Sequence, residues 1–220
     1  MATKSPQHRL WEGNFGDAYV KRNFFTPREL DADYKKTIGV TRTSMNNEFL
    51  GSLKKDIRIL EVGANFGLQL RSLQHMGFTN LYGIELNKRV VEIARKKQHG
   101  MNIIQGDALD IPFKDGYFDL VFTSDVLIHI APENRKKVMS EIYRASKKYI
   151  WGFEYFAEKS TEIPYRGNRN VLWKAPFSKL YMQAFPDLRL VNEKEYRYKG
   201  NNNVDIMFLL EKPVGSGKHE

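Results

Sequence analysis

The sequence predicts an α/β fold built on a parallel, doubly wound sheet, and three observations support this. Between residues 56 and 156, short apolar runs alternate with amphipathic runs that have the period of a helix. The first apolar run ends in a glycine turn, at the edge where such sheets bind ligands. The run at 118–130 is nearly continuous in apolar residues, as expected of a strand buried on both faces.

Five strands are expected in this alternating region. Each is a short apolar run, and the crossovers between them should be right-handed. The runs are IRILEVG (57–63), NLYGIEL (80–86), MNIIQGDAL (101–109), FDLVFTSDVLIHI (118–130) and KYIWGFEYF (148–156).

Three helices are expected between these strands. The run 68–77 has apolar residues at helical spacing. The run 88–100 has an apolar face, a basic last turn and Gly100 as its stop. The run 133–146 follows Pro132, a residue suited to a helix start.

The two ends of the chain have different expectations. Residues 1–50 contain two helix-like runs, 6–23 and 31–53, and are expected to form a helical cap or lid over a main domain at 51–212. Residues 213–220 are expected to be a disordered tail.

The last part of the main domain should end in a hairpin. A helix is expected from about Pro176, followed by strands at 187–199 and 203–212. The asparagines at 201–203 suit the turn between these strands, which should pair antiparallel.

Composition is that of a globular protein. The 220 residues carry a formal net charge of +9, and 41% of them are hydrophobic. No run approaches the roughly 18 unbroken apolar residues that span a bilayer, and the first residues lack the apolar core of a signal peptide. The absence of cysteine excludes disulfides, cysteine nucleophiles and thiolate metal sites. We therefore expect a cytoplasmic protein with no membrane partner, and the dispersed positive charge favours an anionic substrate.

The segment ILEVGANFG, residues 59–67, indicates where a ligand approaches the backbone. Gly63 and Gly67 follow the first strand, where a side chain would block that approach. Asn65 stands between them where many such loops have another glycine, and asparagine tolerates the left-handed conformation. No lysine follows the loop, which argues against a P-loop. The loop alone leaves a dinucleotide, S-adenosylmethionine (SAM) and a plain tight turn open.

Two acids narrow this choice. Glu85 ends the second strand, 22 residues after Gly63, where it can accept hydrogen bonds from both ribose hydroxyls. Asp107 ends the third strand, where it can accept from an adenine amino group, and Ala108 and Leu109 can contact the ring. Glu85 alone fits NAD equally well, whereas Asp107 has no necessary part in the dinucleotide fingerprint. A glycine loop and two acids at three successive strand ends therefore favour SAM.

On these residues the sequence resembles the class I SAM-dependent methyltransferases. The segments LEVGANFG, LYGIEL and IIQGDALDIPFKDGYFDLVFTSDVLIHI match that family's successive motifs, over about 57–156. The resemblance implies an enzyme with SAM as cofactor and a Rossmann-like, seven-stranded sheet whose last strand is antiparallel. It also implies that Glu61 and Gly63 lie near the methionine end of SAM and that Ser124 and Asp125 border it.

A closer resemblance, to the pseudaminic acid biosynthesis-associated methylases, runs almost end to end. It is carried by WEGNFGDAYVKRN, VLIHIAPENRKKV and the later segments EYF, IPYRG, LWKAPF and FPDLRLV. It implies a surface-sugar pathway and supports Tyr19, Arg22 and Asn23 as part of a lid over the cofactor. The full set of residues expected to bind the cofactor is Tyr19, Arg22, Asn23, Glu61, Gly63, Asn65, Gly67, Glu85, Asp107, Ala108, Leu109, Ser124 and Asp125.

The acceptor side is expected at the same sheet edge. Methyl transfer from a sulfonium needs a positioned acceptor, exclusion of water and, for a hydroxyl acceptor, a base. His129, just past the fourth strand, is expected as that base, and Glu154 and Tyr155 at the end of the fifth strand are further catalytic candidates. Tyr165 and Arg166 are expected to bind the acceptor, since arginine can clamp a carboxylate or phosphate. The histidines show no ligand spacing, so no metal site is expected.

The sequence thus predicts a SAM-dependent methyltransferase that acts on an oxygen or nitrogen atom of a small, anionic or sugar-like acceptor. The alternatives are methylation of RNA or of a protein side chain, a non-catalytic SAM-binding module and an NAD oxidoreductase. The N-P-P-Y-type motif of many nucleic-acid amino methyltransferases is absent after the fourth strand, where TSDVLIHI stands. This absence disfavours a nucleic-acid acceptor.

Overall fold

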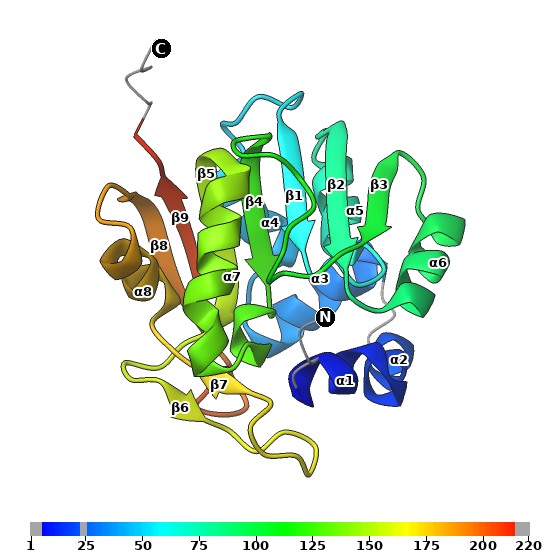
Figure 1. The fold of residues 1–220 in the computed structure, drawn as a ribbon, viewed down its shortest axis with the longest axis vertical. Coiled ribbons are helices and arrows are strands. Elements are labelled where there is room, and N and C mark those ends of the chain that lie inside the picture. Colours follow the sequence, from blue (N-terminus) through cyan, green and yellow to red (C-terminus); the bar gives the residue numbers. More distant parts are fainter. Residues whose placement is uncertain (1–5, 23–25, 214–220) are drawn as a thin grey trace.

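Seven strands form the central sheet in this computed structural model, which describes residues 6–22 and 26–213 (Figure 1). Their order across the sheet is β3-β2-β1-β4-β5-β9-β8. The strands β1 to β5 pair in parallel, and β9 runs antiparallel to both β5 and β8. This confirms the expected mostly parallel, Rossmann-like sheet with an antiparallel last strand. The strands are β1 (Arg58–Val62), β2 (Asn80–Glu85), β3 (Met101–Gln105), β4 (Phe118–Ser124), β5 (Ser146–Tyr155), β8 (Arg189–Arg197) and β9 (Val204–Glu211).

Helices cover both faces of the sheet (Figure 1). α4, α5 and α6 pack on one face, where Leu70 and Ile59 share a buried core. α7 and α8 pack on the other, where Val138 and Leu60 share a second core. Ile59 and Leu60 are successive residues of β1, so the strand is buried on both faces by the alternation of its side chains. The helices are α1 (Pro6–Glu12), α2 (Asn14–Arg22), α3 (Pro27–Thr37), α4 (Arg42–Leu50), α5 (Leu68–His75), α6 (Lys88–Lys97), α7 (Pro132–Ala145) and α8 (Phe177–Ala184).

The helical N-terminal region is divided more finely than expected. The run 6–23 forms α1 and α2, which lie beyond the carboxyl ends of the parallel strands (Figure 1). The run 31–53 forms the end of α3 and then α4, because Gly39 takes a φ of 108° after α3. Met45 and Phe49 of α4 are buried in the same core as β1. The division at residue 50 into cap and main domain stays a prediction, and the tail from residue 214 lies outside the described residues.

The prediction of a strand over 118–130 is wrong in its second half. β4 ends at Ser124, Asp125 takes a φ of 57°, and Leu127–His129 form a single 3-10 turn, η1. A left-handed residue cannot continue a strand. The apolar residues of η1 are buried, so their hydrophobicity reflects burial and not strand geometry.

The C-terminal region follows the expectation with one addition. α8 begins directly after Pro176, and β8 and β9 form the expected antiparallel hairpin. The segment before α8 also contains a small two-stranded sheet, β6 (Thr161–Glu162) with β7 (Trp173–Lys174), which the sequence did not indicate.

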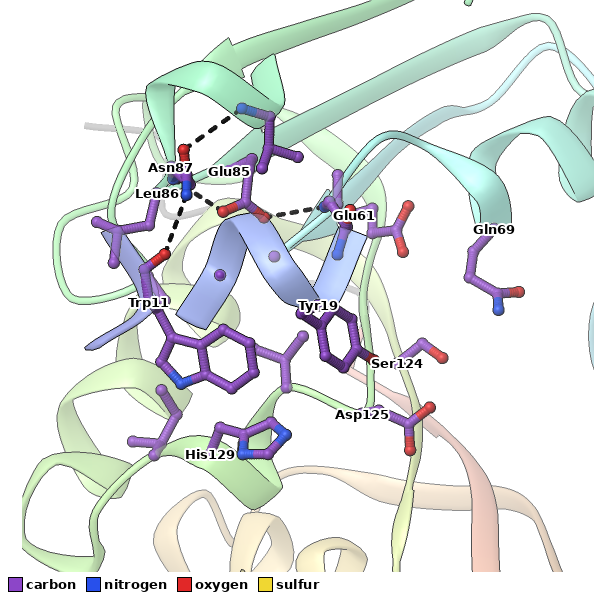
Figure 2. A pocket seen from close by; sticks show the side chains of 18 of the residues that line it. Trp11, Tyr19, Glu61, Gln69, Glu85, Leu86, Asn87, Ser124, Asp125 and His129 are labelled. Carbon is purple, nitrogen blue, oxygen red and sulfur yellow. Dashed lines mark hydrogen bonds between the residues drawn. The ribbon is translucent and has the colours of Figure 1, made fainter. Parts of the chain in front are cut away.

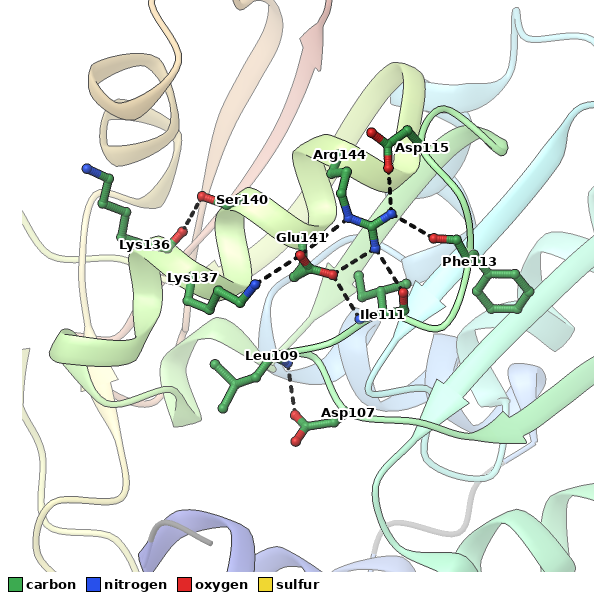
Figure 3. Close-up of polar contacts among 10 residues, drawn as sticks. All are labelled: Asp107, Leu109, Ile111, Phe113, Asp115, Lys136, Lys137, Ser140, Glu141 and Arg144. Atoms are coloured by element: carbon green, nitrogen blue, oxygen red, sulfur yellow. Dashed lines mark hydrogen bonds and ion pairs between the residues drawn. The ribbon is translucent and has the colours of Figure 1, made fainter. Parts of the chain in front are cut away.

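A polar network fastens the loop between β3 and β4 to α7 (Figure 3). Arg144 donates to the backbone carbonyls of Phe113 (2.7 Å) and Ile111 (2.9 Å) and to Glu141 (2.8 Å). Glu141 in turn accepts the backbone N–H of Ile111 at 3.0 Å. The same loop begins with Asp107, so the network fixes the segment that carries this acid.

Arg144→Ala is expected to lower the free energy of unfolding by about 2 kcal/mol, because it leaves two carbonyls without their charged donor and removes one of the cations that pair with Glu141. The control is Arg197→Ala, whose side chain is 75% exposed and pairs only with neighbouring Glu195. It should change stability by less than about 0.5 kcal/mol. Urea unfolding of both variants measures the difference, and equal losses would contradict an anchoring role for Arg144.

Candidate active site

A cavity of about 370 Å³ lies between the carboxyl ends of the parallel strands and the helices α1–α3 (Figure 2). Small-molecule sites are commonly of this size. The site residues expected from the sequence that line it are Tyr19, Glu61, Gly63, Asn65, Glu85, Asp107, Ala108, Leu109, Ser124, Asp125 and His129. Those that do not line it are Arg22, Gly67, Glu154, Tyr155, Tyr165 and Arg166. Asn23 lies outside the described residues.

The loop after β1 has the left-handed backbone that its sequence favours. The φ angle is 74° at Gly63 and 50° at Asn65. A Cβ atom at Gly63 would lie 2.6 Å from Cγ2 of Val126, so the close approach requires glycine. Gly67 also has a positive φ, 85°, but a Cβ there would meet Ile103, so this glycine serves the packing of α5 against β3.

Glu85 joins the loops that follow β1 and β2 (Figure 2). Its Oε2 accepts the backbone N–H of Asn65 at 2.9 Å, and its Oε1 accepts that of Asn87 at 2.8 Å. Burial raises the pKa of this carboxyl, while the backbone donors act in the opposite direction. Each carboxylate oxygen can accept a second hydrogen bond, so the side chain can still hold a pair of ligand hydroxyls.

Asp107, which follows β3, also lines the cavity. Its Oδ1 accepts the backbone N–H of Leu109 at 2.9 Å, and its Oδ2 is 2.7 Å from Nε2 of His8 in α1. The first of these bonds shapes the turn that presents Ala108 and Leu109 to the cavity. The second places α1 in contact with the Asp107 carboxyl group.

Buried acids surround the centre of the cavity. Glu61 is 2% exposed, and its Oε2 has no hydrogen-bond partner among the described residues. Burial raises the pKa of both Glu61 and Asp125, and the nearby Arg42 acts in the opposite direction. Arg42 is itself fully buried and donates to Oγ of Ser124 at 3.2 Å. The unpartnered oxygen at the cavity wall is a ready acceptor for a cationic or N–H-bearing ligand group.

α1 and α2 form one wall of the cavity. The Trp11 ring lies 5.5 Å from that of Tyr19 and 4.6 Å from that of His129 (Figure 2). The carbonyl of Trp11 accepts from Nδ2 of Asn87 at the start of α6 (3.2 Å). Arg22 stands away from the cavity, with its guanidinium 5.9 Å from the Phe15 ring.

His129 is held as a neutral imidazole. It is 8% exposed, and its Nδ1 lies 2.7 Å from the carbonyl of Val171, an acceptor that requires a proton on Nδ1. Burial lowers the pKa of His129 to about 4. Its ring also lies 5.5 Å from that of Tyr165, so the residue joins α1 to the loop that precedes β7.

Glu154 lies behind the cavity wall. It is fully buried, and its two carboxyl oxygens accept the backbone N–H groups of Val126 and Ile128, each at 3.3 Å. Burial raises its pKa to about 8, and the neighbouring Asp125 adds to this shift. The side chain therefore supports the turn that carries His129.

The remaining expected acceptor residues lie outside the cavity. Lys174 stands 5.3 Å from the ring of Tyr155, and burial raises the pKa of Tyr155 to about 12. Arg166 takes a φ of 50° and lies over the ring of Tyr165. A catalytic role for Tyr155 and an acceptor-binding role for Tyr165 and Arg166 stay predictions.

Other cavity residues were not found from the sequence. Asp33 and Tyr34 come from α3, and Tyr198 comes from the end of the β8–β9 hairpin. Arg42, directly behind the cavity, follows the N-cap Thr41 like any first-turn residue. No spacing or motif distinguishes these side chains from those of a solvated helix or turn.

Two kinds of feature were searched for in the described ranges 6–22 and 26–213. No group of three or more histidine, aspartate and glutamate side chains gathers there as it would around a metal ion. No helix in these ranges has the length and apolar character required to cross a bilayer.

A family model and two similar proteins of known activity are methyltransferases. Residues 60–149 match the family model described as "Methyltransferase domain". The phosphoethanolamine N-methyltransferase of Plasmodium falciparum is 25% identical over 180 residues, covering 72% of this chain and 68% of that protein. The glycine/sarcosine/dimethylglycine N-methyltransferase of Actinopolyspora halophila is 32% identical over 147 residues, covering 64% of this chain but only 24% of that protein.

Solved structures support the same fold. The 1,6-didemethyltoxoflavin-N1-methyltransferase of Burkholderia thailandensis, with bound S-adenosylhomocysteine, superposes with a TM-score of 0.69 at 12% identity, covering 96% of this chain and 92% of that one. A SAM-dependent methyltransferase of Methanosarcina mazei superposes with a TM-score of 0.61 at 17% identity, covering 75% of this chain and 96% of that one. The matched domain and the similar sequences identify the protein as a SAM-dependent methyltransferase with SAM as its cofactor, and these solved structures share its fold.

Proposed function

We propose that the cavity binds SAM and a small-molecule acceptor together, and that the enzyme methylates an oxygen or nitrogen atom of that acceptor. The observation that supports this most is the order of groups along the cavity. Glu61 lies in β1 and Gly63 follows it, Glu85 ends β2 and Asp107 follows β3, and all four line one space. Parallel strands present their carboxyl ends at one edge, where such sheets bind nucleotides.

The residues present fit SAM chemically. The unpartnered Oε2 of Glu61 suits the methionine ammonium, and Gly63 leaves room for close backbone approach. Glu85 would hold the ribose hydroxyls, and Asp107 with Ala108 and Leu109 would hold the adenine. The cofactor supplies a methyl group already activated by its sulfonium charge. The chain's own task is then to position the acceptor and exclude water.

Residues of α1 and α2, together with Glu154 behind the cavity wall, would position the acceptor and exclude water. Tyr19 and Trp11 would cover the site, and Glu154 would position Asp125 and His129 through the backbone of η1. His129 can serve as a base for a hydroxyl acceptor, with Nε2 as the free nitrogen. An amine acceptor would not need it in this role.

The acceptor class is proposed from the proteins that the chain resembles. The resemblance to pseudaminic acid-associated methylases supports a sugar-like acceptor, and the curated relatives named above act on phosphoethanolamine and on glycine derivatives. One relative is a tRNA methyltransferase of Xenopus tropicalis, 28% identical over 120 residues and covering 18% of that protein. An RNA acceptor would make binding strongly salt-dependent.

The test is calorimetric titration of the purified protein with SAM, S-adenosylhomocysteine and NAD. We expect saturable binding of the two SAM species and none of NAD. Incubation with methyl-labelled SAM and a panel of sugars, amines and RNA then identifies the acceptor class. Binding of NAD with no SAM binding would contradict the proposal.

SAM binding is expected to release protons. Burial raises the pKa of Glu61 well above the ordinary carboxyl range of roughly 4, so ionisation of this acid against the methionine ammonium would release a proton. Because the bound state favours the ionised acid, affinity should rise with pH until the free protein also ionises Glu61, by at most about tenfold per pH unit. Calorimetry in buffers of different ionisation enthalpy measures the release. Affinity that falls with rising pH would contradict this assignment.

A further inference from the structure

The charge of the cavity is opposite to that of the protein. The chain carries a net charge of +9. No lysine or arginine is found among the described residues that line the cavity, whereas the acids that line it are Asp33, Glu61, Glu85, Asp107 and Asp125. A cleft lined by one sign of charge concentrates ligands of the opposite sign.

Two of these five acids, Asp33 and Asp125, have no partner in the proposed cofactor site. Glu61, Glu85 and Asp107 have expected partners in SAM. A second group of lining residues, here called the acceptor chamber, consists of Tyr19, Asp33, Tyr34, Asp125 and Tyr198. It combines two carboxyls with three phenol rings from three separate parts of the chain.

Further negative charge stands behind the acceptor chamber. Asp205 is fully buried, accepts from the hydroxyl of Tyr198 at 2.8 Å, and has an Oδ1 without a hydrogen-bond partner in the described part of the chain. The guanidinium of Arg42 is already bonded to Asn46 (3.0 Å), Tyr34 (3.3 Å) and Ser124. It is one positive charge beside Glu61, Asp125 and Asp205, whose pKa values burial raises.

We propose that the acceptor is an amine, held as its ammonium ion in the acceptor chamber against Asp125 and among the tyrosine rings. The carboxyl provides the counter-charge, and ring faces attract organic cations. This inference rests on the proposed function and names its substrate class. It replaces the anionic acceptor expected from the net charge, because an anionic group would meet Asp33 and Asp125 without a cation in the wall.

The transfer balances without a redox step. The ammonium first loses one proton, to the Asp125 carboxylate or to water. Its nitrogen lone pair then forms the N–CH₃ bond as the C–S bond breaks, and that bond's electron pair stays on sulfur, which becomes a neutral thioether. The product nitrogen is again a cation, so Asp125 faces a positive group before and after transfer.

The first experiment titrates the protein saturated with S-adenosylhomocysteine with dimethylammonium chloride and, separately, with inorganic phosphate. We expect saturable dimethylammonium binding, at least about tenfold weaker in Asp125→Asn, and no phosphate binding. The control is Asp115→Asn, which removes an equal charge from a side chain 80% exposed and remote from the cavity. It should bind dimethylammonium like the unmodified protein.

Each outcome decides between the two claims. Failure to bind S-adenosylhomocysteine would overturn the proposed function. If S-adenosylhomocysteine binds, three results would overturn the amine acceptor alone. They are no dimethylammonium binding, phosphate binding in its place, or equal dimethylammonium affinity in Asp125→Asn and the unmodified protein.

A second readout separates an amine from a hydroxyl acceptor. Label from methyl-SAM is followed on glucosamine and glucose, and transfer to glucosamine alone supports an amine. Transfer to glucose would assign a hydroxyl acceptor and overturn the proposal.

Discussion

Gly63→Ala is expected to lower the free energy of unfolding by about 2 kcal/mol and to weaken SAM binding by at least about tenfold. The φ of 74° at this position is unfavourable for any residue with a Cβ, at a cost of roughly 1–2 kcal/mol. The added Cβ would also lie 2.6 Å from Cγ2 of Val126. Val126 directly follows Asp125 and precedes η1, so its displacement would move the cavity wall that carries His129.

Gly167→Ala separates these two effects. Gly167 has a φ of 78°, and a Cβ there would meet nothing within 4 Å. This variant should therefore show the backbone cost alone and bind SAM normally. Denaturant unfolding and calorimetry of both variants provide the comparison. If the two lose the same stability and Gly63→Ala keeps full SAM affinity, close approach at Gly63 is not a requirement of the site.

The strand–helix alternation predicted the parallel part of the sheet because both depend on the same local pattern. Ile59 and Leu60 are apolar because β1 is buried on both faces, and that periodicity is visible in the sequence. The same reasoning extended β4 too far. Leu127 and Ile128 are as buried as the strand before them, and only the left-handed Asp125 ends it.

The residues proposed to hold the cofactor could be expected to meet from the sequence because they lie at strand ends. Gly63, Glu85 and Asp107 are each at the end of a recognisable strand, so their convergence follows from topology. The acceptor side lacks this regularity. Tyr34 and Tyr198 are separated by most of the chain and meet only because α3 and the β8–β9 hairpin both reach the cavity. Their hydroxyls and the buried Arg42 carry no local signal of their position.

Glu85→Ala is expected to weaken SAM binding by about 100-fold, the largest loss for a single side chain of the cofactor site. Hydrogen bonds to a charged acceptor contribute roughly 1.5–3 kcal/mol each, and the ribose would lose up to two of them. The backbone N–H groups of Asn65 and Asn87 also lose their acceptor, so the loops after β1 and β2 are no longer joined. Glu193→Ala, an exposed acid on β8, is the charge-matched control and should bind SAM normally.

A ligand lacking the hydroxyls distinguishes ribose contact from loop support. The unmodified protein should bind the 2′,3′-dideoxy analogue of S-adenosylhomocysteine more weakly than the parent compound, because Glu85 then faces no hydroxyl. Glu85→Ala should bind the two compounds equally, since its contact is already gone. If the variant discriminates between them as strongly as the unmodified protein, Glu85 acts only by joining the two loops. The ribose must then be held by another group.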